Sequence, residues 1–331
     1  MKTTSRLAGS AKLLAALLLS SSVAWAQAPA RDVPTTSRGP TSELYIRKRP
    51  VAPEAPVLNQ ELKALLTSKE KQRDDKRLEA IGLLRAFLAS KPTGEAKAEG
   101  TFKLAELVWE ESRRLFLVRM DEFSRSVEKC LQKKDECVPP KEPRIDLKEA
   151  ETLYRDLHDN YPDFRRMDLV TYLIGFAAKE DNREDEAMAR FQEVIDRFPT
   201  STLYGDAWMM IGEHHFAAGD WVKAKAAYLH VGDEAATSDL ALFKVAWCEW
   251  KLGDTTAAAR DFKRVLDKAF KQEREGTEAQ KRRSASLREE ALEYLVVVFT
   301  EDRSISPKEV FDFLVSIDGE QYSRDVMVKV A

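Results

Sequence analysis

The sequence between Asp168 and Phe270 repeats itself three times, and this repetition restricts the possible fold more than any other feature. Equivalent positions in the second and third copies are 34 residues apart, as for Gly212 and Ala246. The first and second copies are 37 residues apart, because three extra residues lie at their junction, near 201–203. A period of this size is typical of stacked-repeat proteins, in which each unit buries its apolar surface against its neighbours.

Each copy places the same residue types on two predicted antiparallel helices. Small residues on the first helix are expected to face small residues on the second, so that the two backbones approach closely. The small residues of the first helices are Gly175, Gly212 and Ala246, and those of the second helices are Ala187, Ala224 and Ala258. Bulky residues one turn later are expected to fill the space towards the next repeat: Phe191, Tyr228 and Phe262.

Turn-forming residues separate the two helices of each copy. They are Asp181-Asn182, Gly219-Asp220 and Gly253-Asp254. Gly and Asn tolerate the left-handed backbone conformation that commonly ends a helix. Pro199 follows the second helix of the first copy and is expected to stop it. The pattern therefore predicts tandem helical hairpins.

The second copy carries the most complete set of markers, Trp208, Ile211-Gly212, Ala224 and Tyr228. This pattern resembles the tetratricopeptide repeat (TPR) family, whose usual markers are a Trp, a Leu-Gly pair, a Tyr, an Ala, a Phe and a Pro. The second copy departs from the family at His215, where Tyr is frequent, and it has no Pro at its end. The resemblance implies an all-α fold, a TPR-type solenoid of helical hairpins.

Helical periodicity extends upstream of the three copies. Gln60–Glu70 and Arg77–Ser90 are predicted as the two helices of an earlier, degenerate repeat. Lys97–Arg114 is predicted as the first helix of the next repeat, with Phe102, Ala105, Val108 and Trp109 in a helical stripe. Its partner is Leu147–Asn160. An insertion at about 116–145 separates these two helices, and Leu117–Leu131 is expected to prolong the first.

Downstream of the copies, the charged stretch Lys271–Arg283 is expected to extend a helix or to form a solvated loop. Ser284–Thr300 is predicted as a further first helix. Ser306 is expected to cap a second helix with Pro307 at its first position. Another helix opens at Gln321, and no polar capping helix follows it. Because terminal repeats normally need such a cap, we expect either a truncated chain or an end covered by a partner.

Residues 1–26 have the features of a secretory signal peptide. Lys2, Arg6 and Lys12 precede the apolar run Leu13–Leu19, and Ala24-Trp25-Ala26 forms a small-x-small cleavage site. Cleavage after Ala26 would place the mature chain in the periplasm. The alternative is an uncleaved anchor, although the apolar run is too short to span a membrane.

The mature chain is expected to begin with a linker and to continue as the solenoid over 58–331. Six of the thirteen prolines lie within 27–57, a composition that favours an extended, semi-rigid chain. Within it, Leu44-Tyr45-Ile46 is either a strand or docking motif, or a chance apolar triplet in a solvated tail. Removal of the signal peptide's positive charges changes the formal net charge from −3 to −6, which argues against nucleic acid or an anionic membrane as partner.

Three cysteines allow few chemical roles. In an exported protein, the nearby Cys130 and Cys137 are expected to form a small disulfide loop, with free thiols as the alternative. Cys248 lies within a repeat helix, where a buried, small apolar role is expected. Metal binding by Cys130 and Cys137 would need further ligands, and no His lies near them in sequence.

The sequence shows no recognisable catalytic, cofactor or metal site. The four histidines are His158, His214, His215 and His230. Neighbouring helical positions point about 100° apart, so His214 and His215 cannot easily share one metal ion. No Gly-rich phosphate loop, Gly-x-Ser-x-Gly elbow or His-Glu-x-x-His pattern occurs. We therefore expect a non-enzymatic protein without a cofactor or a metal.

The TPR resemblance implies a concave groove, lined by the first helices, that receives a partner. Several large side chains occupy the positions expected to face it. They are Tyr172, Phe176, Met209, Phe216, Phe243, Trp247 and Trp250. Aromatic residues are enriched at interfaces, which favours a groove for a peptide or a helix of another protein. The alternative is that these rings pack inside a tightly curled superhelix or beneath the insertion.

Fold alone does not define function, but this chain combines several features that restrict it. An export signal, a Pro-rich arm and an acidic solenoid resemble the periplasmic TPR subunits of the myxobacterial adventurous gliding-motility complex. That resemblance implies a non-catalytic subunit that bridges envelope proteins. One alternative is an accessory factor for cell-wall synthesis or outer-membrane assembly enzymes. A third is a glycan-binding or hydrolytic protein, with sugars stacked on Trp247 or Trp250.

Overall fold

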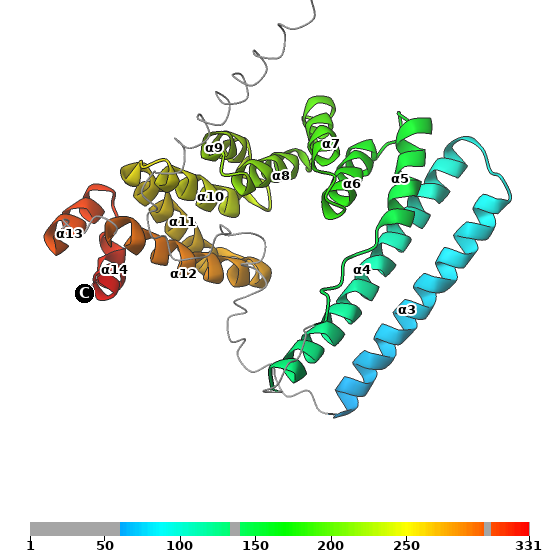
Figure 1. Ribbon diagram of the computed structural model, residues 1–331, viewed down its shortest axis with the longest axis horizontal. Coiled ribbons are helices and arrows are strands. Elements are labelled where there is room, and N and C mark those ends of the chain that lie inside the picture. Colours follow the sequence, from blue (N-terminus) through cyan, green and yellow to red (C-terminus); the bar gives the residue numbers. More distant parts are fainter. Residues whose placement is uncertain (1–59, 133–139, 301–305, 331) are drawn as a thin grey trace, which may run out of the picture. The chain divides into compact units, whose positions relative to one another are not determined.

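The structure, a computed structural model, describes residues 60–132, 140–300 and 306–330. Within these ranges all regular secondary structure is helical, as predicted (Figure 1). The predicted signal peptide and Pro-rich linker lie outside the described residues, as does Cys137. No helix in the described ranges combines the length and the apolar character needed to cross a membrane.

The first described helix, α3, runs without interruption over Gln60–Ala89. The prediction of two helices and a degenerate repeat in this region was therefore wrong. The segment between the two predicted helices contains no Gly or Pro. It also forms ion pairs at helical spacing, Arg77 with Asp74 at 2.9 Å and Lys76 with Glu79 at 2.6 Å. Such pairs support a continuous helix.

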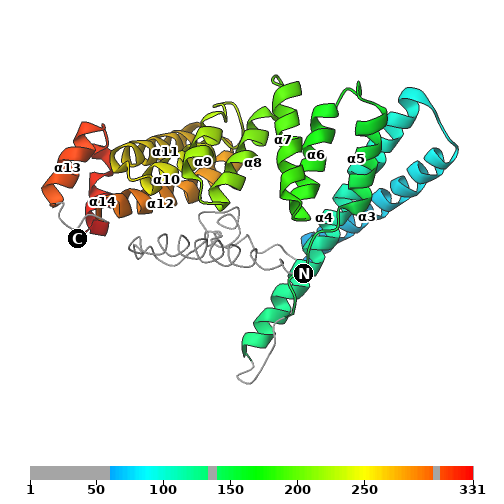
Figure 2. The same ribbon diagram turned by 45° about the horizontal axis from the view of Figure 1, so that its top comes forward.

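Helix α4 spans Gly94–Gln132 and packs against α3. It continues well beyond the predicted end at Arg114, as expected for Leu117–Leu131. The chain then returns along α4 to α5, Lys148–Asn160 (Figures 1 and 2). At 1.5 Å per residue, the 39 residues of α4 extend about 58 Å, far beyond the shorter α5.

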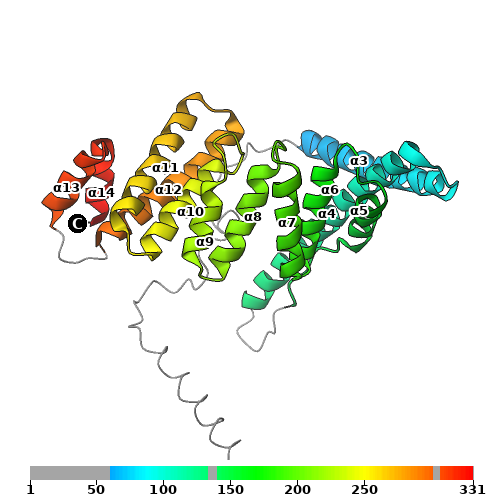
Figure 3. The same ribbon diagram turned by 90° about the horizontal axis from the view of Figure 1, so that it is seen from above.

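The three sequence copies fold as three helical hairpins. Their helices are α6 Met167–Glu180 and α7 Glu184–Arg197, α8 Tyr204–Ala217 and α9 Trp221–Leu229, and α10 Ser238–Lys251 and α11 Thr255–Glu275. Positive φ angles occur between the helices of each pair, 58° at Asn182, 75° at Gly219 and 86° at Gly253. The predicted left-handed turn residues are thereby confirmed. Consecutive helices pack side by side (Figure 3).

The spacing of small residues that recurs in the three copies has a different structural basis from the one expected. The nearest neighbours of a side chain at Gly212 would be the ring atoms of Tyr228, and those at Gly175 would include the ring of Phe191. The glycines on the first helices therefore make room for the aromatic ring one turn further along the second helix. The facing alanines are fully buried, but they are not the closest neighbours.

Helix α11 extends to Glu275, and α12 covers Glu278–Thr300 after a short break at Gly276. Most of the charged stretch Lys271–Arg283 is thus helical. Helix α13, Pro307–Ser316, begins with the predicted cap: the Ser306 side chain accepts a hydrogen bond from the Glu309 backbone, and Glu309 completes a capping box. A 3-10 turn at Glu320–Tyr322 leads into α14, Ser323–Val330.

Candidate functional site

The seven predicted groove residues have two different environments. Met209, Phe216, Phe243, Trp247 and Trp250 are buried, with exposed fractions between 0% and 6%. Tyr172 and Phe176 on α6 keep part of their surface exposed. Burial of the first five matches the alternative that they pack in the core, whereas the two residues on α6 are accessible. A partner-binding role for the set stays a prediction.

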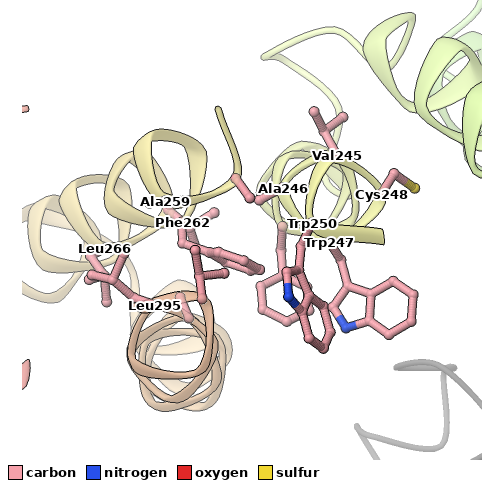
Figure 4. Packing of buried hydrophobic residues seen from close by; sticks show 14 of the residues in the cluster. Val245, Ala246, Trp247, Cys248, Trp250, Ala259, Phe262, Leu266 and Leu295 are labelled. Atoms are coloured by element: carbon pink, nitrogen blue, oxygen red, sulfur yellow. The ribbon is translucent and has the colours of Figure 1, made fainter. Parts of the chain in front are cut away.

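The four buried aromatic members form a continuous cluster with Trp221 of α9 and Tyr294 of α12. The centroid of Trp247 lies 4.8 Å from Phe216, 5.4 Å from Trp221 and 5.6 Å from Trp250. The ring centroid of Tyr294 on α12 lies 5.8 Å from that of Trp250. Figure 4 shows Trp247 and Trp250 on α10 together with Phe262 and Leu295 from the adjacent helices. This packing joins the second and third repeats to α12.

An ion pair is buried beside these rings. Lys244 is 1% exposed, and its ammonium group lies 3.0 Å from a carboxylate oxygen of Glu213 and 4.1 Å from the Phe216 ring centroid. Tyr228 donates a hydrogen bond of 2.7 Å to the same carboxylate. Burial lowers the pKa of Lys244, while Glu213 opposes that shift. The arrangement satisfies a charge that would otherwise be costly to bury.

Two other ionisable groups on α10 are also buried. Glu249 is paired with Lys225 at 2.8 Å, and its second carboxylate oxygen has no hydrogen-bond partner among the described residues. Burial raises the pKa of Glu249 despite the neighbouring ammonium group. Cys248 is fully buried, as predicted, and burial raises the pKa of its thiol to about 12. A thiol with so high a pKa is a poor nucleophile.

An open hollow of about 540 Å³ lies among α3, α4, α5 and α6 and is called the α4 hollow here. Its apolar lining consists of Leu84, Leu107, Trp109, Tyr154 and Leu173. All of these except the buried Tyr154 are partly exposed. Trp109 lies 6.1 Å from Tyr154 and 5.7 Å from Phe176, measured between ring centroids. The hollow therefore adjoins one of the accessible predicted groove residues.

Four charged residues of α4 complete the lining: Lys103, Glu106, Glu110 and Arg113. Glu106 is paired with Lys103 at 2.7 Å and with Arg166 at 3.1 Å. Glu110 is paired with Arg77 at 3.4 Å. Burial raises the pKa of the Tyr154 hydroxyl, and the nearby Glu106 and Glu110 add to that shift. The Tyr154 hydroxyl is therefore neutral at physiological pH.

The histidines take part in side-chain contacts with carboxylates and other rings. His158 lies 3.0 Å from a carboxylate oxygen of Glu193, and His214 lies 3.3 Å from Glu184. The rings of His214 and His215 are 5.4 Å apart at a steep angle. In the ranges that the structure describes, no three His, Cys, Asp or Glu residues are grouped as metal ligands. The predicted Cys130–Cys137 disulfide involves a residue outside these ranges and stays a prediction.

The helical stripe predicted on α4 includes Trp109, but the hollow beside Trp109 was not predicted. Phe102, Ala105 and Val108 of that stripe are buried, whereas Trp109 is partly exposed. A sequence signal existed: Trp109 and Arg113 are four residues apart and so share one face of α4. Leu84, Tyr154 and Leu173 come from other helices, and only tertiary packing brings them together with Trp109.

Comparison with protein families supports the repeat assignment. The tetratricopeptide repeat model matches residues 170–201 and 240–269. These segments cover most of α6 and α7 and of α10 and α11, the first and third copies of the sequence repeat. No curated protein matches the chain. The chain thus contains tetratricopeptide repeats in an all-α solenoid, a repeat type associated with protein–protein interaction.

Proposed function

We propose that this chain is a non-catalytic scaffold that binds other proteins in the periplasm as part of a trans-envelope complex. The repeats support a role in protein–protein interaction, because solenoids present extended surfaces to partners. The export signal in the sequence supports the location. The resemblance to periplasmic TPR subunits of the gliding-motility machinery makes that machinery the first candidate complex.

The observation that carries the proposal is the accessible aromatic surface beside the first repeat. Trp109 and Phe176 are in contact, partly exposed, and adjacent to the α4 hollow. Large aromatic side chains next to a depression are typical of the residues that contribute most to protein–protein affinity. The aromatic cluster around Trp247 instead contributes to packing between repeats.

Site-specific photo-crosslinking in intact cells tests the proposal. A photoreactive amino acid replaces, one at a time, exposed residues beside the hollow (Lys103) and distant from it (Arg264, Arg324). Crosslinks to motility-type envelope proteins are expected. Crosslinks to cell-wall synthases or outer-membrane assembly enzymes would favour the alternative, an accessory factor for those enzymes. Absence of protein crosslinks from every position would contradict the scaffold function.

The proposed location is tested separately by fractionation and N-terminal sequencing of the protein from its native host. Cleavage after Ala26 predicts that the mature chain begins at Gln27 and is released with the periplasmic fraction. Recovery of the uncleaved chain in the membrane fraction would instead support an uncleaved anchor, the alternative noted from the sequence.

A further inference from the structure

We infer that the α4 hollow binds a peptide segment of a partner protein in which an apolar side chain lies close to a carboxylate. The apolar side chain packs on Trp109, and the carboxylate pairs with Arg113. This inference rests on the proposed function, since it names the chemistry of the partner segment at one site on the scaffold.

The lining of the α4 hollow offers apolar surface to a side chain of the partner. Leu84, Leu107, Trp109 and Leu173 come from three different helices and expose apolar surface to the same hollow. Covering apolar surface stabilises a complex by roughly 25 cal/mol per Å². The volume of about 540 Å³ falls within the range of about 300–1,000 Å³ that is usual for ligand-binding pockets. An aliphatic or aromatic side chain can therefore enter.

Three of the four charged residues that line the α4 hollow take part in ion pairs. Glu106 has Lys103 and Arg166 as cationic partners. Glu110 shares Arg77 with Asp74 and Glu111, and Glu111 is also paired with Arg114. Arg113 is exposed and takes part in no ion pair among the described residues. The charge that the hollow leaves uncompensated is thus positive. An incoming carboxylate would complement it, whereas an incoming ammonium or guanidinium group would be repelled.

The spacing of Trp109 and Arg113 on α4 determines how close the apolar side chain and the carboxylate must be in the partner. Trp109 and Arg113 are separated by four residues, so their Cβ atoms lie about 5–6 Å apart on one helix face. An apolar side chain and a carboxylate must then be close in the partner. Residues two apart in an extended peptide, whose side chains point to the same side, meet this condition, as do residues three or four apart on a helix. A guanidinium group also offers bidentate geometry to a carboxylate, which a lysine would not.

Selection from a library of random 12-residue peptides displayed on phage, using the mature chain as target, tests the inference. Enriched peptides are expected to combine Leu, Ile, Met, Phe or Trp with Asp or Glu within four positions. A parallel selection on the Arg113→Glu variant should enrich Lys or Arg in place of the acid. The same sequences from both targets, or no enriched sequences from either, would overturn the inference.

Binding of a selected synthetic peptide is then localised by ¹⁹F NMR of the mature chain labelled with 5-fluorotryptophan. The Trp109 resonance is identified as the one missing from Trp109→Phe, and it should shift during the titration. Arg113→Gln should weaken binding by about tenfold or more, because the hydrogen bonds between the guanidinium group and the carboxylate of the peptide would be lost. Arg119→Gln is the matched control, since Arg119 is an exposed arginine of the same helix outside the hollow. It should bind within about twofold of the unmodified chain.

The outcomes separate this inference from the proposed function. A Trp109 resonance that does not move, or binding that Arg113→Glu leaves unchanged, overturns the peptide site, while crosslinks from Arg264 or Arg324 would still support a scaffold. A chitooligosaccharide that shifts the Trp109 resonance where peptides fail would also overturn it, in favour of glycan binding. Each variant is first compared with the unmodified chain by circular dichroism, so that misfolded proteins are excluded.

Discussion

At the residue scale, glycine and aromatic positions act together rather than separately. The repeat places Gly212 on α8 and Tyr228 on α9, and the structure brings the glycine against the tyrosine ring. The ring is buried, and its hydroxyl is hydrogen-bonded to Glu213, which also holds Lys244. A single close approach thus positions an aromatic core residue and the polar group that compensates a buried charge.

Replacement of Gly212 by Ala should destabilise the protein. The added Cβ would overlap the ring of Tyr228, and overpacking of this kind costs about 1–3 kcal/mol. Urea denaturation followed by circular dichroism measures the change. Gly82→Ala is the control, because no atom lies within 4 Å of its added Cβ and Ala favours helix over Gly, so that variant should gain about 0.5–1 kcal/mol. Equal stability of Gly212→Ala and the unmodified chain would contradict this packing.

Glu249 should make stability depend on pH. Its pKa is raised in the folded state above the ordinary 4.5 by burial, so the folded state holds this proton more tightly than the unfolded state. The stability that Glu249 contributes is therefore present below about pH 4.5 and is lost as the pH rises through the raised value. Glu249→Gln removes this dependence, and the variant should gain stability relative to the unmodified chain between pH 4 and pH 7.

The measurement is the free energy of unfolding of both proteins at several pH values, with the difference plotted against pH. Glu289→Gln, which makes the same substitution at an exposed position of α12, is the control. If the stability difference between Glu249→Gln and the unmodified chain does not change with pH, or favours the unmodified chain as the pH rises, burial does not raise the pKa of Glu249.

At the element scale, local signals determined where helices begin and end when those signals were strong. Gly219 and Gly253 end helices in the left-handed conformation, and Ser306 with Pro307 starts one. Where no breaker stands, the helix continues: α3 passes through the segment in which two helices were predicted. Apolar periodicity resembling a repeat is therefore insufficient, since a hairpin also needs a residue that ends the first helix.

Loss of the capping box should destabilise α13. Ser306→Ala removes the hydroxyl that accepts the Glu309 backbone hydrogen bond, and such changes typically cost about 1 kcal/mol. Hydrogen exchange of amides in Pro307–Ser316 should become faster, whereas α6 and α7 should be unaffected. Ser306→Asp retains an acceptor at the cap and should behave like the unmodified chain. Unchanged exchange in Ser306→Ala would mean that packing alone maintains this helix.

At the scale of the whole molecule, packing is mainly between helices that follow one another in sequence. Among the described helices, contacts between helices that are not consecutive are few. They join helices that still lie close together in the chain, such as α12 with α10 and α12 with α14. Solenoids of this kind have stabilities that depend on each repeat and on its interfaces with its neighbours. A disturbance in one repeat is therefore expected to remain local.

Phe262→Ala tests this expectation. Phe262 is fully buried on α11 and stacks on Tyr294 of α12, so its truncation should cost about 3–5 kcal/mol. Hydrogen exchange should become faster in α10, α11 and α12 and stay the same in α4 and α5. Val222→Ala, at an exposed position of α9, is the control and should change neither region. Equal acceleration throughout the described helices would instead indicate one cooperative unit.

The fold class, the three repeats, their turns and the cap at Ser306 could all be predicted from the amino-acid sequence. These features depend on local chemistry: helical periodicity, residues that accept positive φ, and a side chain that caps the adjacent backbone. The sequence also placed Cys248 in the interior. The continuity of α3 could be argued from local sequence too, because the absence of Gly and Pro was visible there.

Which aromatic residues are accessible could not be predicted from the sequence, because it depends on packing between helices. Phe176 and Trp247 occupy equivalent positions of their repeats, yet Phe176 is partly exposed and Trp247 is buried against Phe216, Trp221 and Trp250. Likewise, the α4 hollow is formed by residues from four helices. Exposure depends on which neighbouring helix covers a side chain, and that neighbour is distant in sequence, so local patterns carry no information about it.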